Sequence, residues 1–240
     1  MKIMLDAGHG LLTIGKETPD GMKEFEFNAA VAEYAKGILS DYQCEVLFAH
    51  DPTGKIDIPL TKRTDYANKA GVDVFVSIHA NAFGPGGWNN TQGIETFVYI
   101  TKPQIALNLA NLIQKKLLEA TGRPNRGVKT ADFHVLRENT MTAILAECGF
   151  MTNQEEAALL KSDEYRKKSA KAIAESLIEF YNLKPKAVNP AKAAEVKPVS
   201  PFAKDAQQWV RDNGISDGSR PQDPITRQEV WVMLKRLAEK

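Results

Sequence analysis

Three apolar segments of the chain, residues 4–10, 76–81 and 144–150, each carry one side chain that can bind a metal or move a proton. These side chains are His9, His79 and Glu147. Apolar runs of this kind are typical of parallel strands that are buried on both faces. Ligands of open α/β sheets bind just beyond the carboxyl ends of the strands. We therefore expect two imidazoles and one carboxylate at one sheet edge, the usual ligand types of a catalytic zinc site.

His9 and His79 supply two ligands. A catalytic zinc site uses three protein ligands and leaves the fourth position to water, so a carboxylate is needed as the third ligand. Glu24 and Glu26 are the candidates. Phe27 begins the apolar stripe of a predicted helix, and Glu24 precedes that helix on the loop that returns from His9. Glu24 can reach across the sheet edge from there, but the residues alone leave both glutamates open.

Glu147 has a different expected role. A glutamate directly after the apolar residues 144–146 is costly to bury unless it has a partner, and a metal-bound water is such a partner. A carboxylate in that position can act as a general base on the water and then as an acid toward the leaving nitrogen.

Each of these residues also has a purely structural interpretation. A single histidine at a strand end is most often a hydrogen-bonded structural residue, Glu147 can cap the next helix, and Asp6 can shape a turn. All three segments are rich in glycine or small residues at their ends, and this joint pattern favours a metal hydrolase.

Strand and helix patterns alternate along most of the chain. We predict strands at residues 2–6, 44–49, 73–78, 94–100, 135–137 and 143–147. Helical spacing falls near residues 27–38, 60–70, 105–117 and 165–183, and a short helix follows a capping box at 152–155. Thr61 is the expected N-cap of the second helix. The alternation predicts an α/β fold, with a twisted, mostly parallel mixed sheet and helices on both faces.

The composition divides the chain into three parts. Residues 1–183 hold the α/β pattern and form the predicted catalytic domain. Residues 184–200 are rich in Pro, Ala and Lys, which is typical of an extended linker. Residues 201–240 have the pattern of two helices and form a small C-terminal module that is marginal in size for a domain on its own.

Charge and hydropathy exclude some classes of protein. The formal net charge of +1 gives no overall attraction to nucleic acid, and the chain has no nucleic-acid-reading motif. No stretch approaches the apolar length of a membrane span. The two cysteines do not make a disulfide framework.

Five ordered motifs are shared with a known family. They are residues 6–10, the Glu24-to-Asn28 spacing, residues 60–63 leading to 67–68, residues 77–82 and residues 145–153. Together they resemble the zinc-dependent N-acetylmuramoyl-L-alanine amidases of the Amidase_3 family, over about residues 1–182.

The resemblance implies a ligand set and a reaction. It assigns the Zn²⁺ ligands to His9, Glu24 and His79 and the catalytic role to Glu147, and the family's Glu-x-x-x-Asn spacing selects Glu24 over Glu26. It implies a peptidoglycan hydrolase in which zinc-activated water cleaves the amide between N-acetylmuramic acid and L-alanine of the stem peptide.

The resemblance is strongest to endolysins of phages that infect Gram-positive hosts. The first predicted strand begins at Lys2 and leaves no room for a signal peptide, so we expect synthesis in the cytoplasm. Action on the cell wall for host lysis would then follow holin-mediated release.

The C-terminal module weakly resembles S-layer-homology motifs, which bind cell-wall polymers, usually as several copies. The matching residues are Phe202, 214–215, 217–218 and 225–230. Only one copy is present, so we expect residues 201–240 either to bind wall glycopolymer or to form a homodimer.

Two further side chains are candidates for substrate contact. Trp88 lies in the loop after His79, and His134 is expected to open a strand toward Glu147. His50 falls in a predicted turn, where we expect it to be exposed. Two alternative functions stay open: a zinc peptidase that acts within the stem peptide, and a non-catalytic wall-binding protein.

Overall fold

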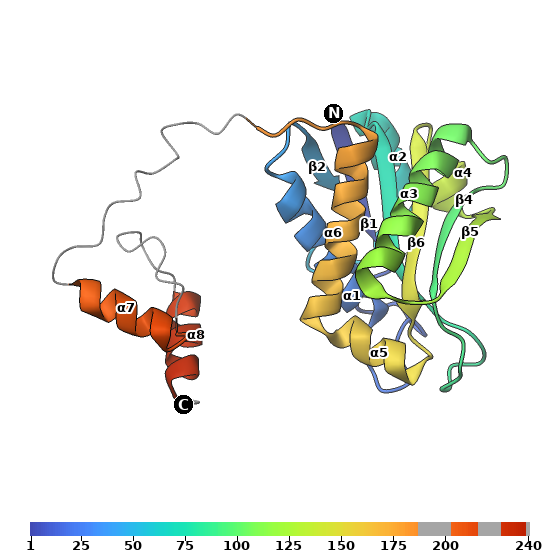
Figure 1. The fold of residues 1–240 in the computed structure, drawn as a ribbon. Helices are drawn as coiled ribbons and strands as arrows, with labels where there is room; N and C mark the ends of the chain where they lie inside the picture. The colour runs from blue at the N-terminus through green and yellow to red at the C-terminus, as the bar shows by residue number, and fades with distance from the viewer. Residues whose placement is uncertain (187–202, 216–226, 239–240) are drawn as a thin grey trace. The chain divides into compact units, whose positions relative to one another are not determined.

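The computed structural model describes residues 1–186, 203–215 and 227–238 (Figure 1). The chain forms two compact units, residues 1–186 and residues 187–240. The predicted linker, residues 184–200, lies almost wholly outside the described residues, since only its first three positions are described.

A six-stranded sheet in the order β2-β1-β3-β6-β4-β5 forms the centre of the first unit. Its strands are β1 (Lys2–Ala7), β2 (Glu45–Phe48), β3 (Val74–Asn81), β4 (Ile94–Tyr99), β5 (Asn125–Ala131) and β6 (Thr142–Phe150). Strands β2, β1, β3 and β6 are mutually parallel, whereas β4 pairs with β6 in the antiparallel sense and β5 is parallel to β4. The predicted mixed, mostly parallel sheet is therefore confirmed.

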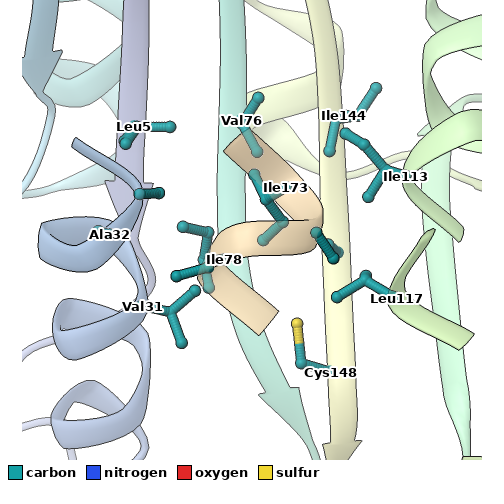
Figure 2. Close-up of a cluster of buried hydrophobic side chains, with 14 of the residues drawn as sticks. Leu5, Val31, Ala32, Val76, Ile78, Ile113, Leu117, Ile144, Cys148 and Ile173 are labelled. Atoms are coloured by element: carbon teal, nitrogen blue, oxygen red, sulfur yellow. The ribbon is translucent and has the colours of Figure 1, made fainter. Parts of the chain in front are cut away.

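Helices cover both faces of this sheet (Figure 1). They are α1 (Glu24–Leu39), α2 (Leu60–Ala70), α3 (Gln104–Thr121), α4 (His134–Arg137), α5 (Gln154–Lys161) and α6 (Asp163–Phe180). The larger core lies between the sheet and α1, α3 and α6, where strand residues such as Val76 and Ile144 meet Val31, Ile113 and Ile173 (Figure 2). A smaller core packs against α2 and α4 on the opposite face and includes Phe75 and Leu145.

Two helix N-caps differ from the expected ones. Helix α2 begins at Leu60 with Pro59 as its N-cap, so the prediction of Thr61 was wrong. The cap of α5 is Asn153, whose side chain accepts a hydrogen bond from the backbone N–H of Glu156. Proline suits the position before α2, because its fixed φ is compatible with entry into a helix.

The strand expected at residues 135–137 is instead the short helix α4. The error has a physical cause, because Val135 and Leu136 are both buried, and two adjacent apolar residues do not distinguish the two periodicities. The true fifth strand, β5, was missed because it is a half-exposed edge strand of mainly polar residues.

The second unit contains helices α7 (Lys204–Asp212) and α8 (Arg227–Ala238), which correspond to the two predicted C-terminal helices. Trp209 and Leu234 are exposed, and Ile215 is buried. None of the helices in the described ranges has the length and apolar character that a bilayer span requires.

Candidate functional site

Three of the predicted site residues meet at the carboxyl ends of β1 and β3. His9 follows β1, Glu24 is the first residue of α1, and His79 lies in β3. One ligand atom from each residue lies within 4.8 Å of the others, a spacing that fits a single metal ion. The Glu24 carboxylate lies between the two rings, 3.3 Å from His9 Nε2 and 3.0 Å from His79 Nδ1.

Electrostatics favour the ligand forms of His9 and Glu24, and pair His79 with the Glu24 carboxylate. Burial lowers the pKa of His9 to about 4, which keeps its imidazole neutral at physiological pH. Burial opposes the charges of Glu24 and His79 too, but their mutual contact outweighs it, lowering the pKa of Glu24 and raising that of His79. Glu24 is therefore an ionised carboxylate, and Asn28 and the Ala80 backbone N–H both donate to its Oε1.

The backbone at residues 8 and 9 is shaped to admit the two rings. A Cβ atom at Gly8 would lie 2.0 Å from His79 Cε1, so the imidazole of His79 occupies the space of a residue-8 side chain. His9 has a φ of 66°, the left-handed region that is costly for a residue with a side chain. Backbone strain of this kind is typical of functional sites.

Glu147 lies within β6, directly opposite His79 in the parallel pair with β3. The expected strand end was wrong, because β6 continues to Phe150. Its Oε2 atom is buried and has no hydrogen-bond partner. Burial raises the pKa of Glu147 to about 8, and the charges of Glu24 and Glu95 contribute, although His79 opposes them. A buried carboxyl oxygen without a partner beside a His–Glu–His cluster fits a site that takes a metal and its water.

A chain of polar contacts behind His79 was not predicted. His79 Nε2 lies 3.1 Å from Ser77 Oγ, and that hydroxyl donates to Asp6 Oδ2 at 2.8 Å. Asp6 pairs with the fully buried Arg63, 2.7 Å away. Arg63 also donates to the carbonyls of Ala7 and His9. Asp6 and Arg63 both lie in the motifs quoted above, but their contact spans 57 positions and has no local signal.

A second charged group lies on the other side of Glu147. Glu95 on β4 is directly opposite Glu147 in the antiparallel pair with β6. Its carboxylate accepts hydrogen bonds from Arg126 Nε at 2.7 Å, Lys129 Nζ at 2.5 Å and Asn81 Nδ2 at 2.8 Å. Burial opposes the charge, but the two cations lower the pKa of Glu95 and keep it ionised.

The structure gives each of the two candidate substrate contacts its own neighbours. Trp88 is 43% exposed and lines a polar hollow of about 590 Å³ together with Asn90 and residues 153–155 at the start of α5. His134 is the first residue of α4 and does not open a strand; its Nε2 lies 3.2 Å from Thr64 Oγ1 on α2.

His50 is buried, so the expectation of an exposed turn residue was wrong. Its Nδ1 accepts a hydrogen bond from the backbone N–H of Ala7 at 2.9 Å. The ring contacts Phe25 and Phe48, and it therefore fixes the end of β1 just before His9.

Comparisons with known proteins agree with this geometry. A family model described as N-acetylmuramoyl-L-alanine amidase, Amidase_3, matches residues 3–179. The chain is 36% identical to an endolysin of Bacillus phage SPP1 over 221 residues, covering 88% of this chain and 76% of the endolysin. It is 32% identical to the N-acetylmuramoyl-L-alanine amidase CwlM of Bacillus licheniformis, covering 76% of this chain and 70% of CwlM.

A solved structure shares the fold. The catalytic domain of CwlV, an N-acetylmuramoyl-L-alanine amidase from Bacillus (Paenibacillus) polymyxa var. colistinus, has a TM-score of 0.69 and 31% sequence identity. The match covers 76% of this chain and 99% of that domain. On its sequence motifs, its fold and its matches to these proteins, the chain belongs to the Amidase_3 family of N-acetylmuramoyl-L-alanine amidases.

Proposed function

We propose that this chain is a zinc-dependent hydrolase that cleaves the amide between N-acetylmuramic acid and L-alanine of the peptidoglycan stem peptide. One observation carries the proposal: a partly buried His9–Glu24–His79 cluster lies one strand away from a carboxyl group whose Oε2 has no partner, in a chain of this amidase family.

The three clustered side chains would hold the zinc ion. His79 is prepared for this role, because the Ser77 hydroxyl donates to Asp6 and so accepts from His79 Nε2. The proton is thereby held on Nε2, and Nδ1, on the side of Glu24, is left free as a ligand atom. Arg63 fixes Asp6 from behind and completes the support.

A zinc ion in such a site lowers the pKa of water to about 7 and polarises a carbonyl. Glu147 supplies the proton transfer. Its carboxyl group, which lies opposite His79 and has an unpartnered Oε2, can accept a proton and return it to the leaving nitrogen of L-alanine.

We propose further that the chain acts as a phage endolysin. The match to the SPP1 endolysin covers more of this chain than residues 1–186 contain, so the likeness continues into the second unit. In this proposal residues 1–183 are catalytic and residues 201–240 bind wall glycopolymer or pair two chains, with release to the wall through a holin. Trp88 and His134 stay proposed substrate contacts.

The test is mass spectrometry of digested peptidoglycan combined with metal analysis. We expect new peptides with an N-terminal L-alanine and glycans with a free lactyl carboxyl group. We also expect about one zinc per chain. Glu147→Gln should keep the zinc and lose about 100-fold or more in kcat, because general acid–base catalysis contributes about 10²–10⁴-fold.

Two results would contradict the proposal. Fragments that keep L-alanine on muramic acid would indicate a peptidase that cuts within the stem peptide. Undiminished turnover by a metal-free preparation would exclude the zinc role. The matched control is Glu119→Gln, which changes an exposed glutamate on α3 and should leave turnover and zinc content as they are.

A further inference from the structure

A row of functional groups crosses the sheet at the level of the metal cluster. His79 on β3 is opposite Glu147 on β6, and Glu147 is opposite Glu95 on β4. Directly opposite residues on neighbouring strands point to the same face of a sheet. The row therefore runs from the metal cluster through the proposed proton carrier to Glu95 and its two cations on β5.

The charges in this group do not balance. Arg126 and Lys129 share the single carboxylate of Glu95, whose side chain is 6% exposed. The cationic side chains are 34% and 41% exposed. Glu95 thus anchors both cations at the rim of the site and neutralises only one of them, which leaves one positive charge and several N–H donors facing solvent.

The position of this charge relative to the scissile amide follows from strand spacing. Neighbouring strands lie about 4.8 Å apart, and an extended peptide advances about 3.4 Å per residue. An amide held beside Glu147 therefore places the next one or two residues of its chain over Glu95 and the cations.

We propose that Arg126 and Lys129 bind a carboxylate on the peptide side of the scissile amide. This inference rests on the proposed function. The lactyl carboxyl group of the glycan is consumed in the amide itself, so the free carboxylates near the bond belong to the stem peptide. Arg and Lys form charge-assisted hydrogen bonds with a carboxylate, which are stronger than hydrogen bonds between neutral groups. The pair therefore makes the enzyme select acidic stem peptides over amidated ones.

A structural role for the same ion pairs is the competing explanation, since they also attach the edge strand β5 to β4. The two roles differ in what Lys129→Ala does. A substrate ligand changes the ratio between two substrates, whereas a strand clamp lowers stability and both activities together. Arg126 still pairs with Glu95 in that variant, so Glu95 keeps a partner and the fold is retained.

The experiment uses two disaccharide–peptides that differ only at the second residue of the peptide, which carries either a free α-carboxylate or its amide. We expect the full chain to prefer the acid in kcat/KM by about tenfold or more, the value of one charge-assisted hydrogen bond. Lys129→Ala should bring the ratio toward one, mainly through KM for the acid. Lys129→Arg should restore it.

The matched control is Lys115→Ala, which removes an exposed lysine of α3 that pairs with Glu119. It should keep the preference of the unmodified chain. An equal rate on both substrates, or a preference that survives Lys129→Ala, would overturn the inference while the amidase function stands. Failure to release alanine peptides from either compound would contradict the proposed function itself, and this inference with it.

Discussion

At the His9–Glu24–His79 cluster, a missing side chain matters as much as the side chains that are present. The His79 ring lies against the Cα atom of Gly8, and His9 next to it adopts a left-handed backbone. A residue with a Cβ at position 8 would force the ring away from Glu24. The Gly8-His9 pair therefore places both imidazoles through backbone shape, before any metal contributes.

Gly8→Ala tests this placement. The added methyl group would lie 2.0 Å from His79 Cε1, so the ring must shift by more than about 1 Å. A displacement of that size can cost about 10²-fold in rate. We expect zinc content and kcat to fall together, with a thermal unfolding midpoint close to that of the unmodified chain.

The control for this substitution lies in α1. A methyl group added at Gly37 would meet no atom within 4 Å, and the residue lies in a regular helix. Gly37→Ala should therefore preserve zinc content and raise stability by about 0.5–1 kcal/mol. A Gly8→Ala protein with full zinc content and normal turnover would show that the ring has room elsewhere.

At the scale of the elements, buried apolar strands were predictable and polar connections were not. Strands β1, β3 and β6 are continuous apolar runs, so their order and the approach of His9, His79 and Glu147 followed from the sequence. Glu24 was singled out by family spacing, since reach alone did not separate it from Glu26. Edge strand β5 has no alternation of apolar and polar residues that would predict a strand. The burial of His50 depends on packing between segments that are distant in sequence.

His50 joins the end of β1 to Phe25 of α1 and Phe48 of β2, and its titration makes this attachment sensitive to pH. Burial lowers its pKa to about 4, whereas an unfolded histidine titrates near 6.5. The unfolded chain therefore binds the extra proton first. The contribution of neutral His50 to the free energy of unfolding is complete above about pH 6.5 and is lost as pH falls toward about 4. At pH 5 the loss is on the order of 2 kcal/mol.

His50→Asn isolates this effect, because the amide oxygen can accept the Ala7 N–H bond but does not titrate. We expect the variant to be less stable at neutral pH, since it loses the ring contacts with Phe25 and Phe48. Its urea-unfolding free energy should fall less than that of the unmodified chain between about pH 7 and pH 5. An equal fall in both proteins would mean that His50 keeps its ordinary pKa.

At the scale of the whole molecule, the chain divides into two compact units, residues 1–186 and 187–240. Among the described residues, the larger hydrophobic cluster ends at Leu183 and the smaller one at Leu145. The segment after α6 still belongs to the first unit, because the Lys186 N–H donates to the Asp41 carbonyl and Gln43 bonds the backbone of Lys184 and Pro185. A truncation that preserves the first unit therefore ends after Lys186.

A chain ending at Lys186 keeps every residue of the proposed active site and of both clusters. We expect it to retain its unfolding midpoint, zinc content and turnover on a disaccharide–peptide, because substrate binding at the metal needs nothing from residues 187–240. Turnover on intact walls should fall by about tenfold or more, since the second unit raises the effective concentration of enzyme at the wall.

Co-sedimentation with walls and light scattering distinguish the two proposed roles of the second unit. Wall binding that is lost at constant molecular mass indicates a glycopolymer site. A molecular mass that falls from two chains to one indicates pairing through α7 and α8. If wall turnover, wall binding and mass all stay the same, the second unit has neither role.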